Sequence, residues 1–174
     1  ATPSSPASAG RDGGARWLAR IIGGMNAILL IAHTPLAQAL RAGALHVFPD
    51  AGAHIEAVDV EPQATPEESL AAAQAALARL SADDGVLILT DLFGATPCNV
   101  AQRLEGGTRT RVLAGVNLPT LLRALSYRQE PLESMMQKAM SGGVQGIMPV
   151  AATAPQHQNK RAGTHDQERD HDQQ

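Results

Sequence analysis

The stretch from Ala27 to Leu40 reads AILLIAHTPLAQAL, and two patterns meet in it at one histidine. Its first six residues form a continuous apolar run, which is typical of a strand buried on both faces of a sheet. From Pro35 to about Val47 the apolar residues recur at helical spacing, with proline at the first position. The stretch therefore predicts a buried strand that ends at His33 and a helix that begins directly after it.

The same alternation of strands and helices continues to about residue 150. Further strands are expected at 54–60, 86–90 and 110–116, with a last short strand at 144–150. Helices are expected at 65–80, 96–104, 119–128 and 131–140, and the first of these begins with Thr65 and Glu68 spaced as a capping box. Strands that alternate with helices through short loops predict an α/β fold. We expect a doubly wound, mostly parallel sheet in the flavodoxin-like order 2-1-3-4, with helices on both faces and a C-terminal edge strand.

The composition is that of one soluble domain with a core of small side chains. The chain has 174 residues, a net charge of −3 and only two Phe, one Tyr and one Trp. This charge, without any basic stripe, argues against nucleic acid as a partner. The single cysteine, Cys98, excludes an internal disulfide and a cysteine-rich zinc site. Because no apolar run approaches the roughly 18 to 20 residues that span a bilayer, we expect a cytoplasmic protein without direct membrane insertion.

The two ends of the chain differ in character from the middle. Residues 1–25 are rich in Ser, Pro, Ala and Gly, and are expected to be a disordered upstream extension or a cloning remnant, with Met25 as the native start. Residues 151–174 are polar and aperiodic, and are expected to be a disordered tail. The spacing of the tail's three histidines places them on no common helix face, so no metal site is expected there; they are His157, His165 and His171. The folded domain is expected to cover 26–150.

Residues able to carry chemistry follow three of the predicted strands. His33 ends the first strand, Asp91 follows the third, and Asn117 follows the fourth. In the expected strand order the first and third strands flank the switch point, where ligands bind in sheets of this kind. We therefore expect His33 and Asp91 to meet there, with two helix N-termini directed at the same place. Phe93 and Asn117 are expected to support this site.

These residue types suit a phosphoryl group. Helix N-termini favour anions, and phosphate above all. A carboxylate that holds Nδ1–H of a histidine leaves the Nε2 lone pair free as a nucleophile. The hydroxyls of Thr34 and Thr96 are expected to donate to phosphoryl oxygens, and Gly94 lets the backbone approach closely. The combination indicates a histidine that accepts a phosphoryl group.

Each of these residues also has a purely structural interpretation. A single histidine after a strand is more often a structural residue than a catalytic one. Asp91 suits a turn or a cap, and Thr96 is a good N-cap residue whatever else it does. His46 and His54 are interpreted as structural. Only the combination at the strand ends favours a functional site.

Three stretches of the chain carry a resemblance to a known family: ILLIAHTPLA (28–37), GVLILTDLFGATPCNVA (85–101) and VLAGVNLPTLLRAL (112–125). In this order they resemble the signature stretches of the mannose-family (mannose/fructose/sorbose) enzyme IIA components of the bacterial phosphoenolpyruvate-dependent sugar phosphotransferase system (PTS). The resemblance covers about residues 26–150 and leaves both ends outside.

The resemblance implies a phosphotransferase that works as a phosphocarrier. Phospho-HPr would donate a phosphoryl group to His33, Asp91 would orient and stabilise the imidazole, and Thr96 would lie beside the phosphoryl group. A IIB protein or domain would be the next acceptor, and neither a metal nor an organic cofactor is expected. The resemblance also implies a homodimer whose C-terminal edge strand is exchanged or paired across the interface, for which VQGIMPV (144–150) is the candidate.

The chain departs from the mannose-transporter pattern at four positions near the expected site. Where the family commonly has Gly after the histidine and Thr after the aspartate, this chain has Thr34 and Leu92. Where the family commonly has a second Gly and an aromatic residue, it has Ala95 and Cys98. These changes leave the acceptor histidine and its aspartate intact. They leave open the sugar, the donor and acceptor specificity, and whether the output is transport or regulation.

Two other classes of protein fit the sequence less well than a phosphocarrier, and a third interpretation stays open. A low-molecular-weight cysteine phosphatase needs an arginine six positions after its cysteine, whereas Arg103 comes five after Cys98. A two-component receiver domain needs an acidic pair where His33 stands. A regulatory or binding module of the same fold, whose phosphorylation state controls a partner protein, stays open as the alternative.

Overall fold

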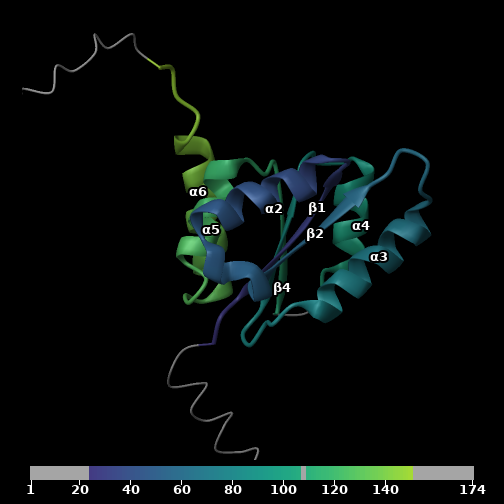
Figure 1. The fold of residues 1–174 in the computed structure, drawn as a ribbon, viewed down its shortest axis with the longest axis horizontal. Helices are drawn as coiled ribbons and strands as arrows, with labels where there is room; N and C mark the ends of the chain where they lie inside the picture. The colour runs from purple at the N-terminus through teal and green to yellow at the C-terminus, as the bar shows by residue number, and fades with distance from the viewer. Residues whose placement is uncertain (1–23, 107–108, 151–174) are drawn as a thin grey trace, which may run out of the picture.

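The sheet has the strand order that the sequence predicts. The computed structural model describes residues 24–106 and 109–150 (Figure 1). Within them, four parallel strands pair in the order β2-β1-β3-β4; their bounds are β1 (Ala27–His33), β2 (Ile55–Val60), β3 (Val86–Thr90) and β4 (Thr110–Ala114). This arrangement confirms the predicted doubly wound sheet of order 2-1-3-4.

Helices cover both faces of this sheet, as predicted. One face is covered by α2 (Leu36–Val47), α5 (Leu118–Ser126) and α6 (Leu132–Gln145), and the other by α3 (Pro66–Arg79) and α4 (Thr96–Leu104) (Figure 1). A short 3-10 helix that the sequence analysis did not anticipate, η1 (Pro49–His54), leads into β2. In the described part of the chain, no helix is both long and apolar enough to span a bilayer.

The central strand β1 carries the core of the domain. Its six apolar residues are fully buried. Alternate side chains point to opposite faces of the sheet. Ile28 and Leu30 pack on the face covered by α2, α5 and α6, and Leu29 and Ile31 on the face covered by α3 and α4. Each such side chain contributes about 1.5–3 kcal/mol when it is buried. The backbone is therefore held rigidly up to its last residue, His33.

The start of α3 confirms the capping box predicted from the sequence. The Thr65 hydroxyl accepts the backbone N–H of Glu68 at 3.2 Å, and the Glu68 carboxylate accepts the backbone N–H of Thr65 at 2.8 Å. The backbone N–H of Thr65, followed by its hydroxyl, lowers the pKa of the Glu68 carboxyl. Both partners of the box are therefore satisfied within one turn.

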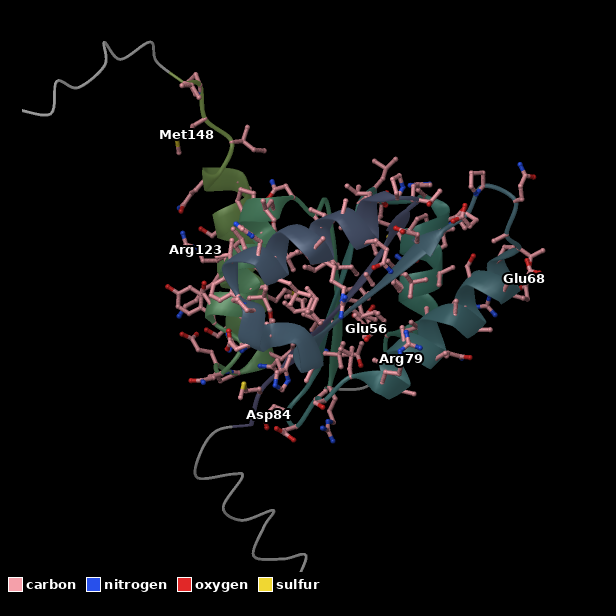
Figure 2. All side chains as sticks on the ribbon, viewed as in Figure 1. Glu56, Glu68, Arg79, Asp84, Arg123 and Met148 are labelled. Atoms are coloured by element: carbon pink, nitrogen blue, oxygen red, sulfur yellow. The ribbon has the colours of Figure 1, made fainter. Side chains whose placement is uncertain are left out.

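The C-terminal part of the domain differs from the prediction. A helix was expected to end near residue 140 and a strand to cover 144–150, but α6 continues through Gly142 and Gly143 to Gln145, and the described residues 147–150 form no strand. The two glycines form a close contact with α5 rather than a helix end. A Cβ at Gly142 would lie 2.9 Å from the Cβ of Arg123, and one at Gly143 would overlap the hydroxyl of Thr120. Figure 2 shows Arg123 beside α6, and Met148 on the segment that follows this helix.

Replacement of Gly143 by valine is expected to lower the free energy of unfolding by roughly 1–3 kcal/mol, because overpacking at a close helix contact forces side chains and backbone apart. Urea denaturation followed by circular dichroism measures the change. Gly52→Val is the matched control, since a Cβ at Gly52 would meet no described atom within 4 Å. An unchanged midpoint for Gly143→Val would contradict the close packing of α5 on α6.

The predicted disordered ends lie almost wholly outside the described residues. Of the expected N-terminal extension only residues 24 and 25 are described, and the expected tail at 151–174 lies outside entirely, together with its three histidines. The expectations for these segments therefore stay predictions.

Candidate functional site

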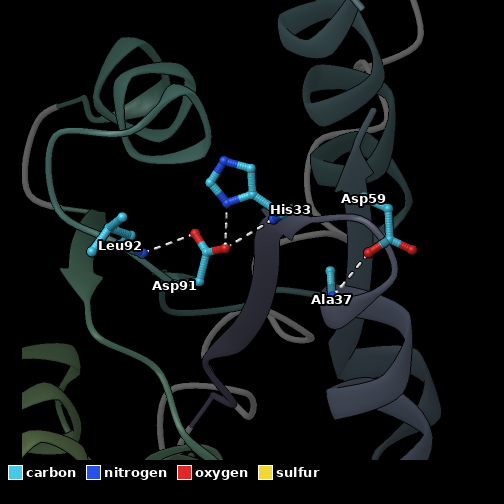
Figure 3. A network of polar contacts seen from close by, with 5 residues as sticks. All are labelled: His33, Ala37, Asp59, Asp91 and Leu92. Carbon is cyan, nitrogen blue, oxygen red and sulfur yellow. Dashed lines mark hydrogen bonds and ion pairs between the residues drawn. The ribbon is translucent and has the colours of Figure 1, made fainter. Parts of the chain in front are cut away.

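His33 and Asp91 meet at the carboxyl edge of the sheet (Figure 3). His33 ends β1 and Asp91 follows β3, and these two strands are hydrogen-bonded neighbours. Oδ2 of Asp91 lies 2.7 Å from Nδ1 of His33 and also accepts the backbone N–H of His33 at 3.0 Å. The strand order thus brings together the two residues that the sequence places at neighbouring strand ends.

The Asp91 carboxylate fixes the orientation of the imidazole. Its other oxygen, Oδ1, accepts the backbone N–H of Leu92 at 2.8 Å, so the carboxylate is held at both ends. A carboxylate beside Nδ1 favours the tautomer with the proton on that nitrogen and the lone pair on Nε2. The Asp91 side chain is 13% exposed and that of His33 is 52% exposed. The ring edge that carries Nε2 faces away from the carboxylate (Figure 3).

Asp91 is ionised at neutral pH. Burial raises the pKa of the Asp91 carboxyl. This effect is outweighed by hydrogen bonds from the backbone and ring of His33 and from the Leu92 N–H, and by the attraction to the His33 ring. The pKa of Asp91 is therefore below its ordinary value. The site therefore combines a fixed negative charge with an exposed imidazole.

The depressed pKa of Asp91 makes the stability of the fold depend on pH. A carboxyl of this kind stabilises the folded state above its unfolded pKa, about 3.9, and the contribution is lost as the pH falls through the lower folded pKa. Wild type is therefore expected to be more stable than Asp91→Asn at neutral pH, with a smaller difference at about pH 3. Urea denaturation at the two pH values tests this, and a difference that stays constant would contradict it.

The helix after Asp91 begins with an open end. Its N-cap is Ala95, and within the described residues no side chain caps it; Thr96 is the first helical residue, so the prediction of Thr96 as the N-cap is wrong. The first backbone bond of α4 joins the Asn99 N–H to the Ala95 carbonyl at 3.0 Å, which places the N–H groups of Thr96 and Cys98 ahead of the helical ladder. Such groups, with the helix dipole, favour an anion.

The turn between Asp91 and α4 depends on a glycine. Gly94 has a φ of +80°, in the left-handed region that glycine adopts without steric cost. Across this turn the Ala95 N–H donates to the Leu92 carbonyl at 3.4 Å. The expectation that the backbone approaches a phosphoryl group closely at Gly94 stays a prediction.

The helix after His33, in contrast, is already capped. The Asp59 carboxylate accepts the backbone N–H of Ala37 at 2.9 Å (Figure 3). It also accepts the backbone N–H of Gln38 at 3.3 Å. Of the two helix N-termini that were expected at the site, that of α2 is therefore occupied by a side chain from β2. A signal for this was present in the sequence: Asp59 is an acidic residue in an otherwise apolar strand end, and Pro35 at the start of α2 offers no side-chain acceptor.

The remaining predicted site residues have different surroundings. Thr34 donates its backbone N–H to the Val60 carbonyl at 3.2 Å. Phe93 is 78% exposed, so it supports no part of the site by packing. Asn117 caps α5 by accepting the Thr120 N–H at 2.9 Å and donates to the Gly143 carbonyl at 3.1 Å, which is a structural role.

Among the residues that the structure describes, the cysteine, acidic and histidine side chains form no second candidate centre. Cys98 is buried, so its thiol does not face a partner. Among the described residues, no three or more His, Cys, Asp or Glu side chains gather where they could hold a metal ion.

Parallel α/β sheets commonly bind ligands at the switch point, and helix N-termini there favour phosphate groups. The family model of the PTS system fructose IIA component (EIIA-man) matches residues 27–140. The chain belongs to this family of PTS IIA components.

Similar proteins agree with this family. The mannose-specific EIIAB component of Escherichia coli K12 is 31% identical over 106 residues, which cover 56% of this chain and 33% of that protein. The chain thus spans about a third of the length of this curated relative.

Solved structures share the fold. The mannose/sorbose-specific IIA subunit from Enterococcus faecalis has a TM-score of 0.65 at 22% identity, over 75% of this chain and 98% of that one. The EIIA component from Streptococcus agalactiae has a TM-score of 0.63 at 23% identity, over 72% and 97%.

Proposed function

We propose that this protein is a phosphocarrier that accepts a phosphoryl group on Nε2 of His33 from phospho-HPr and passes it to a IIB protein or domain. The observation that carries the proposal is the 2.7 Å contact between Asp91 Oδ2 and His33 Nδ1, which leaves the opposite ring nitrogen exposed. Membership of the PTS IIA family supports the choice of donor and acceptor.

The transfer needs a nucleophile and a place for charge. The Nε2 lone pair of His33 attacks the phosphorus atom, a bond from Nε2 to phosphorus forms, and the bond between phosphorus and the donor breaks with its electron pair going to the donor. The ring becomes positively charged while Nδ1 keeps its proton, and the Asp91 carboxylate stabilises that charge. The onward step to IIB is the same exchange with a new nucleophile.

The open start of α4 supports a place for the phosphoryl oxygens. In the proposal, the Thr96 and Cys98 N–H groups and the Thr96 hydroxyl donate to them, the Gly94 turn allows close approach, and the Thr34 hydroxyl donates from the side of His33. Catalysis of phosphoryl transfer depends mainly on positioning the reactants and stabilising their charge. This arrangement of donors meets that demand without a metal.

Exposed apolar residues beside His33 support docking by a protein. Leu92 and Phe93 directly follow Asp91 and are 61% and 78% exposed. Aromatic side chains such as that of Phe93 are enriched where proteins bind one another. A partner docked over them would cover the imidazole and exclude water during the transfer.

We also propose that the protein forms a homodimer through its C-terminal segment. Ile147, Met148 and Val150 are exposed apolar residues, and the described residues give this segment no strand partner within one chain. Sedimentation velocity is expected to show a dimer, and a monomer at all accessible concentrations would contradict this part of the proposal.

The central test is phosphorylation of the full chain with phosphoenolpyruvate, enzyme I and HPr, followed by intact mass. One acid-labile phosphoryl adduct is expected, absent when HPr is omitted and removed when IIB is added. No adduct under conditions that phosphorylate a known IIA would overturn the proposal. An adduct that no IIB removes would instead favour the regulatory module.

A further inference from the structure

The strand β2 lies at one edge of the sheet and has a strand neighbour, β1, on one side only. Successive residues of an edge strand direct their backbone N–H and C=O groups alternately toward the neighbouring strand and away from it. The Val60 carbonyl faces β1, because it accepts the N–H of Thr34 directly after that strand. The backbone groups of Ile55, Ala57 and Asp59 therefore point outward, where a strand of another chain would be able to pair with them.

Two long side chains of α2 donate to these outward carbonyls. Nε2 of Gln38 donates to the Ala57 carbonyl at 2.9 Å. Nε of Arg41 donates to the Ile55 carbonyl at 3.0 Å. The third outward residue, Asp59, is also bound to this helix, because its carboxylate accepts a backbone N–H in the first turn. All three outward residues of β2 thus form hydrogen bonds with α2.

The spacing of the two donors suits the spacing of the two carbonyls. Gln38 and Arg41 are three positions apart, which places them on one face of α2 about 4.5 Å apart along its axis. Ala57 and Ile55 are two positions apart on β2, about 6.6 Å along the strand. The difference is small for two long side chains. The order is reversed between the two elements, as it is when a crossover helix runs antiparallel to the strands that it connects.

The opposite edge of the sheet, at β4, lacks such a cover. By the same alternation, the outward residues of β4 are Thr110, Val112 and Ala114. The Thr110 carbonyl accepts from the side chain of its own neighbour, Arg111. Among the hydrogen bonds between described residues, none reaches the Val112 or Ala114 carbonyl from another element. The cover on β2 therefore comes from the particular side chains of α2 and is not shared by both edges.

We propose that Gln38 and Arg41 close the outer edge of β2 against pairing with a second copy of this chain. A strand from outside would have to displace both side chains before its own N–H groups reached the two carbonyls. Without them β2 is suited to pairing, because its six residues, IEAVDV, are mostly apolar and include three β-branched side chains. This inference is independent of the proposed phosphocarrier function.

The double variant Gln38→Ala/Arg41→Ala tests the closure in the full chain. It keeps the backbone of α2 and the Asp59 cap, and alanine favours the helix, so circular dichroism is expected to show wild-type secondary structure. Sedimentation velocity is expected to show a species of twice the wild-type mass at protein concentrations roughly tenfold below any at which the wild type forms one. The reason is that each hydrogen bond gained between copies contributes about fivefold.

A dilution series of ¹H–¹⁵N spectra locates the contact between the copies. In the double variant, the amide signals that depend on concentration are expected to be those of β2, with Ile55, Ala57 and Asp59 among them. The same signals of the wild type are expected to stay in place. A double variant with the wild-type mass at every concentration, or one whose concentration-dependent signals lie outside β2, would overturn the inference.

Gln102→Ala/Arg103→Ala is the matched control, because it removes the same two residue types from exposed positions of α4. There Arg103 pairs with the Glu67 carboxylate at 3.5 Å. This control is expected to keep the wild-type mass.

The single variants Gln38→Ala and Arg41→Ala each free one carbonyl and are expected to associate less strongly than the double variant. They provide the test if the double variant does not fold, and wild-type mass in both would then overturn the inference. Phosphorylation of His33 is read separately, so a failure of the phosphocarrier proposal leaves this result unchanged.

Discussion

The His33→Ala variant is expected to form no phosphoryl adduct, with a fall in rate of roughly a thousandfold or more, as is typical when a nucleophile is removed. The nearby hydroxyls of Thr34 and Thr96 do not replace it, because a neutral hydroxyl is a weak nucleophile until a base activates it. Intact mass after incubation with phosphoenolpyruvate, enzyme I and HPr measures the loss.

The matched control for this variant is His54→Ala. His54 ends η1, and its Nδ1 pairs with the Ser81 carbonyl at 2.7 Å. It therefore lies at the amino end of β2, whereas His33 lies at the carboxyl edge of the sheet. This variant is expected to be phosphorylated at the wild-type rate. An adduct on His33→Ala equal to that on His54→Ala would show that the acceptor is another residue.

The Asp91→Asn variant is expected to be phosphorylated roughly 10²- to 10⁴-fold more slowly. An amide in place of the carboxylate is able to donate to Nδ1, which moves the ring proton to Nε2 and removes the nucleophilic lone pair. It also fails to stabilise the positive charge that develops on the imidazole. Quenched-flow phosphorylation measures the rate, and hydrolysis at neutral pH measures the lifetime of the adduct.

Asp50→Asn is the chemical control, because it makes the same change in η1. The Asp50 carboxylate pairs there with Arg128 at 2.7 Å, away from the His33–Asp91 pair. Wild-type phosphorylation is expected. If Asp91→Asn matched Asp50→Asn in both phosphorylation rate and adduct lifetime, the role assigned to Asp91 would be wrong.

The sheet and the meeting of His33 with Asp91 are predictable from the sequence because the signals are local. A continuous apolar run such as that of β1 identifies a strand buried on both faces, and the capping box at Thr65 marks a helix start within four residues. The strand order then places the ends of β1 and β3 together.

The parts that sequence analysis missed depend on contacts between distant segments. Gly142 and Gly143 have the composition of a helix end, yet they are the surface on which α6 meets α5. The cap on α2 comes from Asp59, 22 positions from the Ala37 N–H that it accepts. That contact depends on the register of β2 beside β1, so the local sequence shows an acidic residue in an apolar strand end but does not identify its partner.

The measurement that tests the central claim most directly is NMR of the phosphorylated wild type with ¹⁵N-labelled histidine. The ¹⁵N shifts and the coupling to phosphorus identify which nitrogen of His33 carries the phosphoryl group. We predict phosphorylation on Nε2, with Nδ1 still protonated and paired with Asp91. A phosphoryl group on Nδ1, or on any other residue, would contradict the account.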